Sequence, residues 1–268
     1  MSLFSESRKR LSRAVLHAEA VKTIWEGLIH PESYKTVIEM NSDWTEGVAK
    51  YIRSSPVPEN DLAVEFGEMF YQLRAALDHL IYKASGIAEG VEPPSNENRV
   101  EFPICIEPER FKKSTVSDDS FPKQLRDWLE GIQPYNAPKQ AGTDLEFVVH
   151  ALRLLHDCAR KDRHRRLHVI AAVPTEFRHD IFSRPGRVLS MQPLRTNLLE
   201  GKNEFLRIKT AGFQVGGRDG IIKLNSDVLV EISIEEIPIR RPGESAAALN
   251  CVFESVDKVI SYFEGWHE

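Results

Sequence analysis

The feature that most constrains the fold of this chain is a long apolar stripe between residues 62 and 84. Its apolar residues recur at steps of three and four positions, at Leu62, Phe66, Met69, Leu73, Leu77, Leu80 and Ala84. That spacing puts them on one face of a helix. We therefore predict a helix over 59–85 that ends at Ser85-Gly86 and buries its apolar face in a helical bundle.

Three further helices and a hairpin are predicted in the first part of the chain. Residues 5–28 predict a helix, and the β-favouring runs 36–40 and 48–52 predict a hairpin. A short helix is expected at 122–130. Another is expected over 143–166, because Thr143 and Glu146 have the spacing of a capping box.

The intervening stretch 90–122 is rich in Pro, Glu, Asn and Ser, and we expect it to cross the surface irregularly. The apolar residues expected to anchor it are Phe102, Ile104, Ile106 and Phe111.

The sequence changes character after residue 167. Short β-favouring runs are expected at 168–173, 205–210, 220–224 and 228–234, with turns at 216–217, 219–220 and 225–226. Hairpin turns also explain the glycine-rich stretch 212–220. A last helix is expected at 245–263. The predicted fold class is α+β, with a helical bundle carrying a β-hairpin over 1–167 and a β-rich part closed by a helix over 168–268.

Composition limits the class of protein. Of the 268 residues, 41% are hydrophobic and 28% are charged, which is typical of a folded globular chain. The net charge of −5 gives no global case for nucleic-acid binding, but residues 150–187 hold nine Lys or Arg against four Asp or Glu. Three dispersed cysteines, no continuous apolar leader and no 18-residue apolar run favour a cytoplasmic protein without a membrane span.

Arg74 and His79 lie off the apolar stripe, so burial of the helix face does not explain them. Arginine stabilises anionic oxygen, and histidine exchanges protons near neutral pH. Five residues of helix separate the two by about 140° around the axis. They would converge more easily on one ligand if a second helix or a partner subunit met this face beside Ala75 and Ala76. The alternative is that Arg74 makes a salt bridge and His79 packs at a helix boundary.

The spacing Arg74-x4-His79 on a long helix resembles the signature of the HEPN superfamily. These are helical domains that often dimerise and include metal-independent ribonucleases. The surrounding residues are similar to an uncharacterised family of bacterial proteins over much of 60–168, and the segments that carry this similarity are Gly67-Glu68, 73–80, 102–104, 133–135 and 162–165. The resemblance implies a dimer with His79 as base and Arg74 as phosphate stabiliser. Nuclease members commonly have a polar residue where this chain has Ala75.

A basic run at the end of the 143–166 helix is the second candidate. Arg160, Lys161, Arg163, His164 and Arg165 could bind phosphates. Equally, cations at a helix C-terminus complement its dipole. We find no motif for a metal or a cofactor, so none is expected.

These observations predict a homodimer that binds RNA or a nucleotide and is a candidate metal-independent ribonuclease. The alternative is a non-catalytic interaction module that dimerises through the long helix.

Overall fold

The structure is a computed structural model that describes residues 3–28, 34–53, 59–117, 120–164, 169–184, 187–194, 204–211, 221–234 and 244–267. In chain order the elements are α1 (Ser5–Leu28), β1 (Tyr34–Met40), β2 (Glu46–Arg53), α2 (Glu59–Glu89), η2 (Glu97–Arg99), α3 (Pro108–Phe111), η3 (Thr115–Ser117), α4 (Lys123–Gly131), η4 (Pro134–Asn136), α5 (Ala137–Gln140), α6 (Glu146–His164), β3 (Val169–Arg184), β4 (Arg187–Pro193), β5 (Glu204–Ala211), β6 (Ile221–Ile234) and α7 (Glu244–His267). The predicted α+β class is confirmed.

The chain divides into two compact units. The helical unit comprises Met1–Val21, Ala63–Leu167 and Ala246–Glu268, and the strand unit comprises Lys22–Leu62 and His168–Ser245. The sequence predicted a single boundary at residue 167, whereas each of these units is built from separate stretches of the chain. The hairpin belongs with the later strands because β2 pairs with β5, and α7 belongs with the helices.

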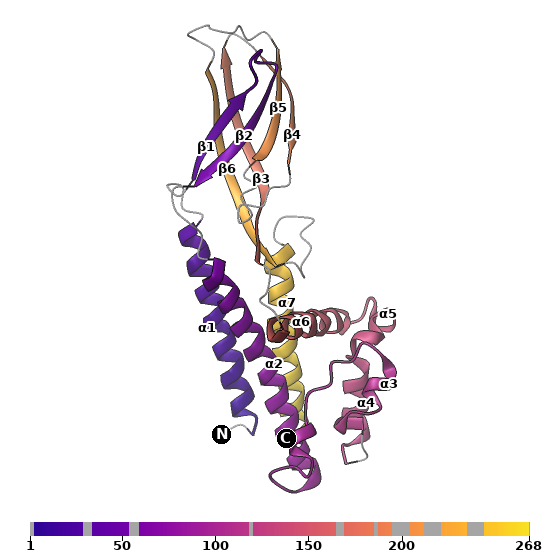
Figure 1. Ribbon diagram of the computed structural model, residues 1–268. Helices are drawn as coiled ribbons and strands as arrows, with labels where there is room; N and C mark the ends of the chain where they lie inside the picture. Colours follow the sequence, from indigo (N-terminus) through magenta and orange to yellow (C-terminus); the bar gives the residue numbers. More distant parts are fainter. Residues whose placement is uncertain are drawn as a thin grey trace. The chain divides into compact units, whose positions relative to one another are not determined.

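In the helical unit, α1, α2 and α7 run alongside one another (Figure 1). Arg8 of α1 pairs with Glu264 of α7 at 2.5 Å and also with Asp257. Trp128 of α4 stacks on Tyr262 of α7, with ring centroids 3.8 Å apart. These interactions join α1 and α4 to α7.

The apolar stripe of α2 is buried within the unit, as its amphipathic pattern requires. Its residues from Phe66 to Ala84 are at most 2% exposed. The large apolar residues that α2 leaves exposed are Val64 and Tyr71, at 55% and 52%.

The predicted end of α2 at Ser85-Gly86 is wrong. Ser85 Oγ donates to the Ile81 carbonyl inside the helix, which continues to Glu89. A Cβ at Gly86 would lie 2.9 Å from the Val91 carbonyl oxygen, so this glycine permits the returning chain to pass closely. The left-handed residue after the helix is Gly90, with φ of 70°.

Two other local predictions need correction. Ile106 does not anchor the 90–122 stretch, because it is 39% exposed, whereas Phe102, Ile104 and Phe111 are buried. The helix expected from 143 begins at Glu146. The Glu146 carboxylate accepts from the Gly142 N–H at 2.7 Å, one residue earlier than a capping box requires.

The strand unit contains an antiparallel sheet in the order β1-β2-β5-β4 and a second antiparallel pair, β3-β6. The predicted hairpin is confirmed as β1 and β2. On β5, Phe205, Leu206 and Ile208 are buried.

The turn predicted at Asn225-Ser226 is wrong, since β6 runs unbroken from Ile221 to Ile234. Asn225 and Ser226 lie opposite Asp180 and His179 of β3, so ladder pairing prevails over local turn preference. Strand β4 and most of β3 were not predicted. The stretch 212–220 lies outside the described residues.

Among the described helices, none combines the length and the apolarity needed to cross a lipid bilayer.

Candidate functional site: a cationic groove beside α2

Arg74 and Asp78, one turn apart on α2, hold both backbone polar groups of a single residue, Phe102. Arg74 Nη2 donates to the Phe102 carbonyl oxygen at 2.7 Å, and the Phe102 N–H donates to Asp78 Oδ1 at 2.9 Å. The two side chains also pair with each other, with Arg74 Nη2 lying 2.9 Å from Asp78 Oδ1. This clamp fixes the guanidinium and the chain at residue 102 against α2.

The segment after Phe102 has a second anchor. The Cys105 N–H donates to Oε1 of the fully buried Gln133 at 2.8 Å, and Gln133 Nε2 donates to the Leu129 carbonyl at 2.8 Å. The Phe102 ring is completely buried. Residues 102–105 are therefore held at both ends, by α2 and by the chain that follows α4.

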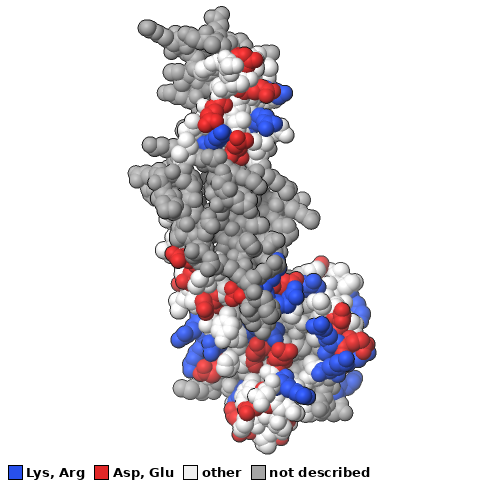
Figure 2. All heavy atoms as spheres, viewed as in Figure 1, with Lys and Arg blue, Asp and Glu red and all other residues white. Residues whose placement is uncertain are grey.

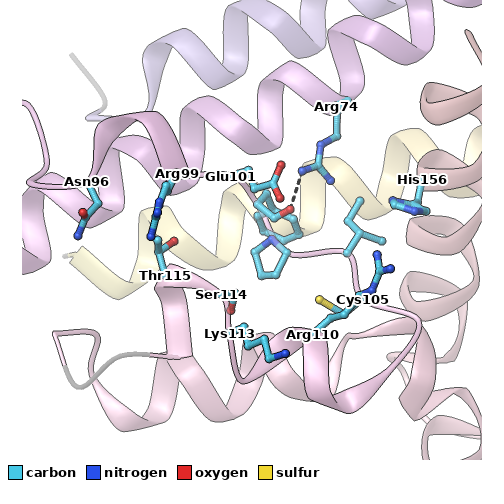
Figure 3. Close-up of a pocket in the computed structure, with 13 residues that line it drawn as sticks. Arg74, Asn96, Arg99, Glu101, Cys105, Arg110, Lys113, Ser114, Thr115 and His156 are labelled. Carbon is cyan, nitrogen blue, oxygen red and sulfur yellow. Dashed lines mark hydrogen bonds between the residues drawn. The ribbon is translucent and has the colours of Figure 1, made fainter. Parts of the chain in front are cut away.

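This segment forms one side of a groove of about 360 Å³. Arg74 of α2 and His156 of α6 line it, together with residues of η2 and of the stretch from α3 to η3 (Figure 3). Toward one end lie Arg99 and Thr115, and toward the other lies His156. The volume is in the range of small-ligand sites.

Positive charge dominates the groove lining. Four side chains are cationic, those of Arg74, Arg99, Arg110 and Lys113, against one carboxylate, that of Glu101. Within the described part of the chain, Arg99 and Lys113 form no ion pair. On the face drawn in Figure 2, basic and acidic side chains are interspersed. An excess of cations is thus shown for the groove lining and not for the face drawn.

Three polar side chains of the groove lining have hydrogen-bonding capacity that the described residues do not use. Arg74 Nη1 makes no hydrogen bond within the described residues, although Nε and Nη2 are both engaged. Thr115 Oγ1 is buried and also has no hydrogen-bond partner there. Arg110 has only a long contact, 4.0 Å from its Nε to Glu107 Oε2, and its side chain is 70% exposed.

His156 and Cys105 are the uncharged titratable groups of the lining. Burial, and then the positive charge of Arg74, lower the pKa of His156. Burial raises the pKa of the Cys105 thiol. Near neutral pH the groove therefore presents a neutral imidazole and a protonated thiol, so Cys105 is a poor nucleophile.

The structure does not bring Arg74 and His79 together within one chain. Arg74 lines the groove, whereas His79 is exposed, does not line it, and acts electrostatically on Glu6 of α1. Arg74 does make the salt bridge of the alternative interpretation, with Asp78.

Two side chains of the basic run fall within the described part of the chain, and neither belongs to the groove lining. Arg160 is exposed and Lys161 is half-buried. The side chains of Arg163 and His164, and the whole of Arg165, lie outside the described residues. Asp162 packs against α2, because a Cβ at Gly67 would lie 2.8 Å from the Asp162 carboxyl carbon.

The lining residues that sequence reasoning missed include four that carry or can gain a positive charge, namely Arg99, Arg110, Lys113 and His156. The first three fall in the stretch expected to be irregular, where no periodicity marks them. His156 directly follows Leu155 of the buried α6 stripe and so invites interpretation as a packing residue. Only the fold brings these four together with Arg74.

Comparisons with family models, with curated proteins and with solved structures give no match to this chain. The described residues contain no group of three or more His, Cys, Asp or Glu able to hold a metal ion.

Proposed function

We propose that the helical unit binds RNA or a nucleotide through its phosphates in the groove beside α2. The observation that carries this proposal is the convergence of four cationic side chains on one small groove that contains a single carboxylate. Arginine and lysine donate charge-assisted hydrogen bonds to phosphate oxygens.

Preorganisation supports the proposal. Asp78 and the Phe102 carbonyl hold the Arg74 guanidinium in place, and its side chain is only 13% exposed, so binding a phosphate at Nη1 would order little more of it. The distribution of the cations suits more than one phosphate, since Arg99 lies toward the end of the groove away from His156 (Figure 3).

RNA cleavage by Arg74 and His79 is a separate and weaker proposal. A base and an electrostatic stabiliser must reach the same phosphodiester, and His79 does not line the groove that Arg74 lines. It is tested by incubating labelled single-stranded RNA with the protein in the presence of a chelator, comparing wild type with His79→Ala. Loss of cleavage in that variant alone would support the pair as catalytic.

Binding is tested by fluorescence anisotropy with a labelled single-stranded RNA. The variant R99Q/K113Q should bind RNA more weakly than wild type. The slope of log affinity against log salt concentration should become shallower by about 0.7 for each phosphate that the variant no longer neutralises. The matched control is K112Q/K123Q, which removes the same charge at two exposed lysines that do not line the groove.

A second variant, R163A/R165A, tests whether the basic run binds instead. Equal reductions of affinity in R99Q/K113Q and in the control would show that net charge alone attracts RNA and would refute the groove. Competition by adenosine mono- and diphosphate then separates a nucleotide site from an RNA site.

The homodimer through the long helix is a proposal with less support, because the stripe that predicted it is buried within the helical unit. A dimer through α2 would have to use the exposed Val64 and Tyr71. Light scattering at micromolar protein concentration tests this proposal, and a monomeric mass would refute it.

A further inference from the structure

His156 differs from the other cation-forming residues of the groove in that it can gain or lose its charge near neutral pH. It extends from α6 toward the groove that Arg74 lines from α2 (Figure 3). We propose that His156 couples anion binding in this groove to proton uptake, by binding the anion as an imidazolium beside Arg74. This inference deepens the proposed function and rests on it.

The surroundings of His156 explain why the charge is absent without a ligand. Within the described part of the chain, the charged groups that act on it are Arg74 of α2 and, from its own helix, Arg153, Asp157 and Arg160. Cys105 and Arg110 line the same groove. Cations outnumber anions among these groups. Together with burial, they disfavour a further positive charge and lower the pKa of His156.

A bound anion reverses this balance. A phosphodiester or sulfate between Arg74 and His156 offsets the cations and accepts a hydrogen bond from the imidazolium, so the pKa of His156 rises on binding. Affinity is then highest below the lowered pKa of the free protein. The affinity falls as pH rises from the pKa of His156 in the free protein to its pKa in the complex. The total fall is about tenfold for each pH unit that separates these two pKa values.

The anion must be one that does not titrate itself. A terminal phosphate has a pKa near 6 and loses charge as pH falls, which opposes the effect. Sulfate and internal phosphodiesters keep their charge over this range. The coupling therefore favours a phosphodiester over a phosphate monoester as pH falls.

The experiment follows the histidine resonances of the full-length protein by NMR between pH 5 and 8, with and without sodium sulfate. The His156 resonance should titrate below the ordinary range in the free protein and at higher pH with sulfate. Sulfate affinity should fall by about tenfold or more from pH 5 to pH 8 in wild type if the pKa moves by a unit or more. It should be nearly flat in H156Q.

The matched control is H150Q, at an exposed histidine of the same helix that does not line the groove. It should retain the wild-type pH dependence. If H156Q fails to fold, the wild-type resonance still decides the question.

An unchanged or lowered His156 pKa in sulfate overturns the inference, as does full pH dependence in H156Q. Absence of any sulfate binding overturns both the inference and the proposed anion site. Proton-coupled sulfate binding without RNA or nucleotide binding upholds the inference and refutes the proposed function.

Discussion

Replacing Asp78 with Ala tests whether the clamp on Phe102 stabilises the helical unit. The substitution removes the acceptor of the Phe102 N–H and the partner of Arg74. A hydrogen bond to a charged group contributes about 1.5–3 kcal/mol, and a helical ion pair at i,i+4 contributes about 0.5 kcal/mol. Because the Asp78 side chain is 36% exposed, water replaces part of this stabilisation, and we expect a net destabilisation of about 2 kcal/mol.

Arg153 and Asp157 of α6 provide a matched control. They have the same residue types at the same i,i+4 spacing, with Arg153 Nε donating to Asp157 Oδ2 at 2.8 Å. The Arg153 side chain is 51% exposed, against 13% for Arg74. Within the described residues this second pair clamps no backbone group. Asp157→Ala should therefore cost about 0.5 kcal/mol or less.

Urea unfolding followed by circular dichroism at 222 nm measures both variants. The gain in helix propensity from Asp to Ala is common to both, so the difference between them isolates the clamp. With a urea dependence of about 2 kcal/mol per molar, the Asp78→Ala midpoint should fall by roughly 1 M. If the two variants lie within about 0.5 kcal/mol of each other, the clamp does not stabilise the fold and the reasoning is refuted.

Three further outcomes are expected. Gly67→Ala places a methyl group 2.8 Å from the Asp162 carboxyl carbon. This overlap should outweigh the gain of about 1 kcal/mol in helix propensity and destabilise the protein by about 1 kcal/mol in urea; a stabilised variant would show that Asp162 moves aside freely. Gln133→Leu leaves the buried Cys105 N–H unpaired and should cost about 2 kcal/mol in the same assay. Because burial raises the pKa of Cys105, iodoacetamide should alkylate it at pH 8 more slowly than free cysteine, as read by mass spectrometry; equal rates would contradict that burial argument.

Features that depend on local pattern were predictable from the sequence. The stripe from Leu62 to Ala84 predicted α2, and helices were also expected close to where α1, α4, α6 and α7 lie. The hairpin followed from two β-favouring runs around turn residues. In each case the signal and the element occupy the same short stretch of chain.

Features that depend on distant partners were not predictable in the same way. Asn225 and Ser226 have strong turn preference, yet they lie opposite residues of β3 more than forty positions earlier in the chain. Gly86 was predicted to end the helix, but it lies inside α2. A side chain there would collide with the Val91 carbonyl oxygen, which accounts for a glycine at this position. Position in the tertiary fold prevailed over local preference at both places.

The same distinction explains what the sequence revealed about the site. The five-residue spacing of Arg74 and His79 singled out an arginine that lines the groove. Residues four apart are the ones that meet on a helix, however, and Asp78 stands at that position. The carboxylate of Asp78 holds both Arg74 and the peptide at Phe102, so it fixes two parts of the groove lining at once. The histidine that shares this groove with Arg74 comes from α6, more than eighty residues away in sequence. Arg74 is oriented by its own helix, and His156 is supplied by another helix. No spacing within one helix could have predicted that the two residues line the same groove.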